Sequence, residues 1–148
     1  MGATFKISKE VEIKSSIEKI FEFLTNPAKI PLVLPGLVQN INIPKLPLVK
    51  GSKFNYKYQM FGFVFEGVWT VTQIKPPTVY HAATTGGIPS KWEYKLSKSK
   101  NKTFVKLKIE YETPKTVLDH LKQSIVQRMN DKECDLYLHN LKTVCEMQ

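Results

Sequence analysis

The middle of this chain alternates between aromatic and polar residues, and this pattern limits the fold more than any other feature of the sequence. Between Lys53 and Met60 the even-numbered residues are Phe, Tyr, Tyr and Met, and the odd-numbered ones are Lys, Asn, Lys and Gln. Successive side chains of a β-strand point to opposite faces, so the alternation predicts one aromatic face and one wet face. The pattern returns over residues 63–71, 92–96 and 105–111. It predicts an antiparallel sheet whose apolar face another element must cover.

The last part of the chain is long enough to provide that cover. Residues 116–147 have helical periodicity, and Thr116 followed by Asp119 resembles a capping box. One arc of this helix, roughly 80° wide, is expected to lie on the sheet. It consists of Leu118, Leu121, Ile125, Met129 and Leu136. A second apolar cluster on nearly the opposite side is expected to pack on the short helices or on a second copy of the chain. It consists of Cys134, Leu138, Leu141 and Cys145.

The remaining segments complete an α+β order of elements. Residues 4–14 alternate as a first strand if a bulge near Ser8–Lys9 restores the phase. Two short helices follow, the first starting at a capping box of Ser15 and Glu18 and the second ending at Pro35-Gly36. Further strands are predicted over residues 38–43 and 79–85. A chain of 148 residues without an internal repeat or linker is expected to form a single domain, residues 1–148.

Charge and composition narrow the possible partners. The formal charge of +9 comes from twenty-one Lys and a single Arg, whereas recognition of bases and phosphates favours Arg, so specific nucleic-acid binding is not expected. The amino terminus lacks the apolar core of a secretory signal, and Lys6 stands where a myristoylation motif needs Ser or Thr. We therefore expect a cytoplasmic protein without a lipid anchor. Transient contact with a membrane surface stays open, as does the choice between monomer and dimer.

The inward face of the predicted sheet is unusually rich in aromatic residues. These residues are Phe54, Tyr56, Tyr58, Phe63, Phe65, Trp69, Trp92, Tyr94 and Tyr111. Each ring alone is explained by core packing, but many large rings opposite one helix can also leave a cavity. In that case the tyrosine hydroxyls, together with Arg128 and Lys132 of the helix, would be its polar anchors. The alternative is that Arg128 and Lys132 only snorkel into water.

Catalytic and cofactor signals are weak by comparison. His81, His120 and His139 stand alone, with no serine or cysteine at the spacing of a nucleophile motif. No Cys or His spacing suits a metal, and Gly86-Gly87 lacks the Lys and Ser/Thr of a phosphate loop. Cys134 and Cys145 would be about 16 Å apart on one helix, so both are predicted to be free thiols. The sequence thus favours binding over catalysis and predicts no cofactor and no metal.

Three segments of the chain resemble the helix-grip superfamily, which includes START lipid-transfer domains, birch-pollen-allergen-like proteins, polyketide cyclases and coenzyme-Q-binding proteins. They are SIEKIFEFLTNPAKIPLVLPG, VWTVTQIKPPTVYHA and KTFVKLKIEYETP. The resemblance implies a sheet of about seven antiparallel strands wrapped around a long carboxy-terminal helix, two short helices after the first strand, and a ligand cavity in between. Family members often carry a W-x-P-G-like run after the short helices, whereas this chain has Val33-Leu34-Pro35-Gly36.

The resemblance also implies which residues line the cavity. On the strands they are the inward aromatic residues with Leu107 and Ile109, and on the helix they are Leu121, Ile125, Arg128 and Met129, with Lys132 beside them. The function expected is that of a binding protein or carrier for a hydrophobic ligand. A long-chain fatty acid is favoured, and an isoprenoid or quinone-like lipid is an alternative. The competing hypothesis is a polyketide cyclase or dehydratase acting on an aromatic substrate, which needs a His or a carboxylate inside the cavity.

Overall fold

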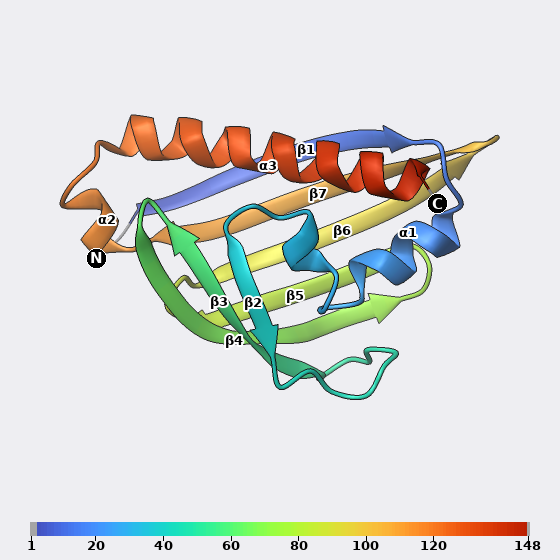
Figure 1. Cartoon of the computed structure of the whole chain (residues 1–148), viewed down its shortest axis with the longest axis horizontal. Helices are drawn as coiled ribbons and strands as arrows, with labels where there is room; N and C mark the ends of the chain where they lie inside the picture. Colours follow the sequence, from blue (N-terminus) through green and yellow to red (C-terminus); the bar gives the residue numbers. More distant parts are fainter. Residues whose placement is uncertain (1–2, 148) are drawn as a thin grey trace.

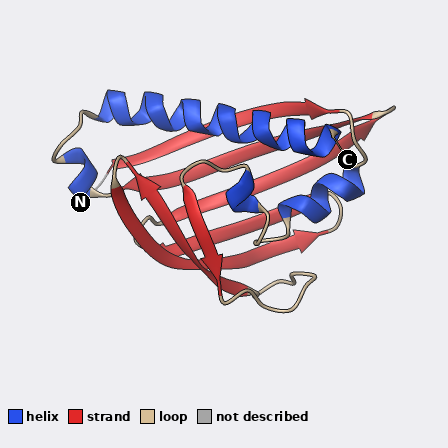
Figure 2. Cartoon of the chain, in the orientation of Figure 1, coloured by secondary structure: helices blue, strands red, loops and turns tan. Residues whose placement is uncertain are grey.

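The computed structural model describes residues 3–147 and contains one curved, seven-stranded antiparallel sheet. The strands are β1 (Ala3–Ile13), β2 (Leu37–Ile41), β3 (Lys53–Met60), β4 (Phe63–Lys75), β5 (Val79–Gly86), β6 (Ser90–Ser99) and β7 (Lys102–Thr113), in the spatial order β1-β7-β6-β5-β4-β3-β2. The helices are α1 (Ile17–Leu24), the 3-10 helix η1 (Ile30–Leu32), α2 (Lys115–Leu118) and α3 (Gln123–Glu146). The sheet curves around α3, and α1 and η1 cover the same concave side (Figure 1, Figure 2). This arrangement is the predicted helix-grip fold of the α+β class.

The alternation along the strands places the aromatic residues on the concave face, as predicted. Phe54, Tyr56 and Met60 of β3 are buried, and so are the inward residues of β7 from Val105 to Tyr111. Glu66 of β4 points outward and is exposed. Burial of these rings against the helices provides the main driving force for the fold, because the opposite face carries Lys and Glu side chains that stay in water.

The first strand differs from its prediction in one detail. β1 pairs with β7 without interruption, from Ala3 opposite Thr113 to Ile13 opposite Thr103, so the bulge expected near Ser8–Lys9 is wrong. It is not needed, because the apolar residues of β1 all have odd numbers and share a face. Lys9 occupies that same face, and its ammonium lies 2.9 Å from Asp131 and 3.2 Å from Asp135 of α3.

Helix α1 begins one residue later than the predicted capping box. Ser16 is its N-cap, and the Ser16 hydroxyl accepts a hydrogen bond from the backbone N–H of Lys19 over 3.2 Å. The apolar stripe expected on this helix is confirmed, since Ile17, Ile20, Phe21 and Leu24 are all buried. The helix therefore closes one end of the concave face, and Figure 1 shows it beside the carboxy-terminal end of α3.

The carboxy-terminal helix requires two corrections. The predicted single helix over residues 116–147 is divided into α2 and α3 by residues 119–122. Of the face predicted to lie on the sheet, the residues within α3 are instead exposed, with Ile125 at 41%, Met129 at 49% and Leu136 at 47% of their full accessible area, whereas Leu118 and Leu121, which lie before α3, are partly buried against the core. The buried face of α3 consists of Val126, Asn130, Cys134, Tyr137, Leu138, Leu141 and Cys145. The second apolar cluster, Cys134, Leu138, Leu141 and Cys145, is thus the one that faces the core, and Asn130 and Tyr137 share its face because both find hydrogen-bond partners in the interior.

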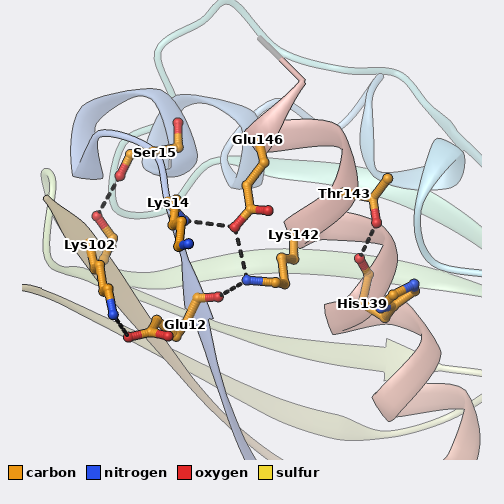
Figure 3. Close-up of polar contacts among 9 residues, drawn as sticks. Glu12, Lys14, Ser15, Lys102, His139, Lys142, Thr143 and Glu146 are labelled. Carbon is orange, nitrogen blue, oxygen red and sulfur yellow. Dashed lines mark hydrogen bonds and ion pairs between the residues drawn. The ribbon is translucent and has the colours of Figure 1, made fainter.

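The end of α3 is fixed to the first strand by polar contacts (Figure 3). The Glu146 carboxylate accepts hydrogen bonds from the backbone N–H of Lys14 and from the Lys142 ammonium, each over 2.8 Å. Lys142 also donates to the backbone oxygen of Glu12 over 2.6 Å, and the Glu12 side chain pairs with Lys102 over 3.0 Å. These contacts hold the end of α3 against the end of β1, and they fix the distance between the helix and the sheet at this end of the molecule.

Candidate functional site

A cavity lies between the concave face of the sheet and the helices. Its volume is about 110 Å³. Its wall is formed by Ile7, Leu24, Pro27, Ile30, Leu34, Leu37, Asn40, Phe54, Tyr56, Tyr58, Met60, Trp69, Tyr80, Thr84, Ile88, Ser90, Trp92, Tyr94, Ile109, Tyr111, Asn130, Glu133, Cys134 and Tyr137. A concave, mostly apolar wall with a few polar groups is the usual form of a small-molecule site.

Most of the strand residues that were predicted to line a cavity do line this one. The predicted residues that line it are Phe54, Tyr56, Tyr58, Trp69, Trp92, Tyr94, Ile109 and Tyr111. Phe63, Phe65 and Leu107 share the concave face but do not reach the cavity. Phe63 lies near the β3–β4 turn, where its ring centroid is 5.5 Å from that of His120, and Leu107 is completely buried in the core.

The predicted helix residues do not line the cavity. Arg128 and Lys132 are exposed, as are Ile125 and Met129, and Leu121 lies in the segment between α2 and α3. Because α3 turns its other side inward, the cavity is lined from this helix by Asn130, Glu133, Cys134 and Tyr137. The spacing of Asn130, Cys134, Tyr137 and Leu141 is helical, so counting Asn and Tyr as inward residues would have identified this face.

A polar corner is present where β3, β7 and α3 meet, and we call it the acidic corner. It consists of Tyr58, Tyr111, Asn130 and Glu133. The Tyr58 hydroxyl donates to the Glu133 carboxylate over 2.6 Å, and the Asn130 amide donates to the Tyr111 hydroxyl over 2.7 Å. Burial raises the pKa of Glu133 above its ordinary value, and burial also raises the pKa of Tyr111 to about 12.

The backbone approaches this corner closely at Gly36. A Cβ at this position would collide with the Glu133 carboxylate and with the Tyr58 ring. Burial, reinforced by the neighbouring carboxylate, raises the pKa of Tyr58 well above its ordinary value. This phenol therefore stays protonated, and its O–H donates a hydrogen bond to Glu133. The acidic corner was missed by the sequence analysis, because Glu133 stands between Lys132 and a cysteine in a charged stretch of helix.

The other polar groups of the wall bond mainly to each other. At the β5–β6 turn the Tyr56 hydroxyl accepts from the backbone N–H of Ile88 over 3.1 Å, and the Thr84 hydroxyl donates to the Ile88 carbonyl over 2.7 Å. Across the cavity the hydroxyls of Tyr94 and Tyr137 share a hydrogen bond of 2.5 Å. These bonds fix the rings in place and leave their faces as the surface offered to a ligand.

The histidines lie apart from the cavity. His81 is on β5 with its Nε2 3.9 Å from Glu93, His120 bonds to the backbone oxygen of Thr116 at the end of α2, and His139 is exposed on α3. None of the three lines the cavity. Glu133 does, and it is therefore the group of the wall best suited to transfer a proton.

Comparisons with known proteins agree with this architecture. A family model described as polyketide cyclase / dehydrase and lipid transport matches residues 4–146. The chain belongs to this family. No curated protein is detectably similar in sequence. None of the helices within residues 3–147 is long and apolar enough to cross a lipid bilayer.

Solved structures with the same fold span several members of the superfamily. Ara h 8.0201 has a TM-score of 0.67 at 13% identity, over 99% of this chain and 100% of that one. A START superfamily protein from Mycobacterium smegmatis has a TM-score of 0.75 at 11% identity, over 96% of this chain and 97% of that one. The di-domain ARO/CYC StfQ of the steffimycin biosynthetic pathway has a TM-score of 0.75 at 9% identity, over 97% of this chain and 51% of that one. At these identities the likeness shows the shared fold alone.

Proposed function

We propose that the chain binds a small, mostly apolar molecule in the cavity between the sheet and α3 and carries it in solution. The observation behind the proposal is the wall itself, in which Trp69, Trp92 and Tyr80 present ring surfaces beside one polar corner. Burial of an apolar body against such a wall is favourable by about 25 cal/mol per Å². The family description, which includes lipid transport, supports the same kind of ligand.

A long-chain fatty acid is the ligand that the sequence analysis favours, and two properties of the cavity bear on it. The cavity volume of about 110 Å³ lies below the ~300–1,000 Å³ common for small-molecule sites, so the wall would have to open further for a long acyl chain than for a compact ring system. Arg128 and Lys132, the expected partners of a carboxylate, are exposed. We therefore propose a compact ligand as the better fit, with fatty acids as the alternative to be tested beside it.

Calorimetric titration with naphthalene and with fatty acids of eight to eighteen carbons tests this function. We expect naphthalene to bind, and fatty-acid affinity to stop increasing with length once the cavity is filled. The matched variants are Leu34→Trp, which fills the cavity, and Leu32→Trp, which adds the same ring to a residue 74% exposed. Only Leu34→Trp should lose binding. Equal binding by the two variants, or no binding of any compound to the wild type, would overturn the proposal.

A second candidate function, a cyclase or dehydratase-like reaction, is favoured by Glu133 inside the cavity. A carboxylate with a raised pKa beside a phenol can remove a proton from carbon next to a carbonyl group. The test is deuterium exchange at the acidic carbon of a naphthyl β-diketone, followed by NMR. Exchange above the buffer rate that is lost in Glu133→Gln supports catalysis, whereas exchange at the buffer rate in the wild type excludes this chemistry for that substrate class.

A further inference from the structure

The cavity has an unusual charge balance for this chain. The whole protein carries a formal charge of +9, yet no Lys, Arg or His is among the residues of the described chain that line the cavity. Glu133 is the one carboxylate among them. A ligand inside the wall therefore meets an acid and no compensating cation, although the outer surface is strongly basic.

The polar atoms that remain free at the cavity are mainly acceptors. The Asn40 amide nitrogen donates to the Pro27 carbonyl over 2.8 Å, but its buried Oδ1 accepts no hydrogen bond from residues 3–147. The Asn130 amide nitrogen is used by Tyr111, which leaves the Asn130 oxygen available. A carboxylate offers about four lone-pair sites, and on Glu133 the Tyr58 hydroxyl and the backbone N–H of Gly36 occupy two of them.

Most donors of the wall are already occupied by other wall groups. The Tyr58 hydroxyl donates to Glu133, and the Thr84 hydroxyl donates to the Ile88 carbonyl. The indole N–H of Trp92 donates to the Ser90 hydroxyl over 2.9 Å. Trp69 donates to the Tyr80 hydroxyl over 3.0 Å. Three hydroxyl hydrogens can still be donated, those of Tyr111, of Tyr80, which accepts from Trp69, and of one member of the Tyr94–Tyr137 pair. Within the acidic corner the free donors are the Tyr111 hydroxyl and the second N–H of Asn130, and the free acceptor positions on Glu133 and Asn130 outnumber them.

We propose, on the basis of the function proposed above, that the polar group of the ligand is a hydrogen-bond donor, an alcohol, a phenol or a protonated amine, set against Glu133. A buried acceptor gains a partner when such a group enters, whereas a carboxylate brings a second negative charge next to the first. The ligand class is therefore a compact, largely apolar alcohol or amine. For an acyl ligand, the free acceptors beside Glu133 favour the long-chain alcohol over the acid.

A set of ligands with one body and different heads tests this preference on the wild-type protein. Titration with 2-naphthol, 2-naphthylmethylamine, 2-methoxynaphthalene and 2-naphthoate keeps the naphthalene ring and changes only the head. We expect the phenol and the amine to bind about tenfold or more tightly than the methoxy compound, which equals about 1.4 kcal/mol, and the carboxylate to bind most weakly. A flat ranking, or tightest binding by the carboxylate, would overturn the inference.

Two variants separate the role of Glu133 from the effect of ring burial. Glu133→Gln should lose most of the preference for the amine and keep the affinity for 2-methoxynaphthalene. The control is Glu66→Gln, which removes an exposed carboxylate from the outer face of β4 and should leave the ranking unchanged. An unchanged preference in Glu133→Gln contradicts the inference. If the wild type binds the methoxy compound but shows no preference, the proposed function stands and this inference fails; if it binds none of the four, both fail.

Discussion

At the scale of single residues, Glu133 is the group with the largest consequence for this protein. It places a carboxylate in a wall otherwise made of rings and aliphatic chains, and its near neighbours are Tyr58, Tyr111 and Cys134. None of these can offset its charge. Glu133 thus determines both the chemistry that a ligand meets and how the folded state responds to pH.

Replacement of Glu133 by Gln is expected to change the pH dependence of stability. The folded state holds the Glu133 proton more tightly than the unfolded chain because burial raises its pKa, so this group makes the free energy of unfolding fall as pH rises above 4.5. Glu133→Gln should remove that part of the slope and be at least as stable as the wild type at pH 8. Urea unfolding of the wild type and the variant between pH 4.5 and 8 measures how the free energy of unfolding changes with pH in each. Identical slopes in wild type and variant would contradict the assignment, and Glu66→Gln is the control.

At the scale of secondary-structure elements, the two faces of α3 have different roles. One face carries Leu141 and Tyr137 into the core with no exposed area, and the other leaves Leu136 almost half exposed. The ion pairs of Lys9 with Asp131 and Asp135 add to the orientation of the helix, but partly exposed pairs contribute only about 0–1 kcal/mol. Apolar burial therefore decides how α3 is rotated.

Two leucines on α3 provide a matched test of this rotation. Leu141→Ala removes side-chain volume from the core and should lower the free energy of unfolding by about 2–5 kcal/mol. Leu136→Ala makes the same chemical change at a residue 47% exposed and should alter it by no more than about 0.5 kcal/mol. Chemical denaturation of both variants measures the difference. Equal losses, or a larger loss for Leu136→Ala, would mean that the helix presents its other face to the sheet.

At the scale of the whole molecule, the cavity lies between the sheet and the helices, so a ligand bound in it should add to the stability of the folded state. A ligand that binds only the folded state at one hundred times its dissociation constant adds about 2.7 kcal/mol. For a chain of this size we expect 2-naphthol to raise the melting temperature by roughly 5–10 °C. Differential scanning calorimetry of wild type and Leu34→Trp measures the effect. A rise of the same size in both proteins would place the ligand on the surface.

The success of sequence reasoning depended on how clearly each element separates apolar from charged residues. On β3, and on β7 from Val105 to Glu112, every second residue is charged or polar and the others are large and apolar, so the inward faces could be predicted. On α3 the inward face includes Asn130 and Tyr137, and the outward face includes Ile125 and Met129, which reverses the usual signal. The position of Glu133 depends on this rotation, because a small turn of a helix decides whether a residue points inward or outward. The face of α3 that carries the acidic corner could therefore have been identified from helical spacing, and its tyrosines were predicted, but the inward direction of the charged Glu133 at the edge of that face could not.

The two tryptophans have a practical consequence. Trp69 and Trp92 are the only ones in the chain, their ring centroids are 5.5 Å apart, and both line the cavity. All intrinsic indole emission therefore originates at the site itself, with no background from the rest of the protein. A molecule that enters the cavity changes the polarity around both emitters at once, so the unlabelled protein can report its own loading by a change in fluorescence colour and intensity.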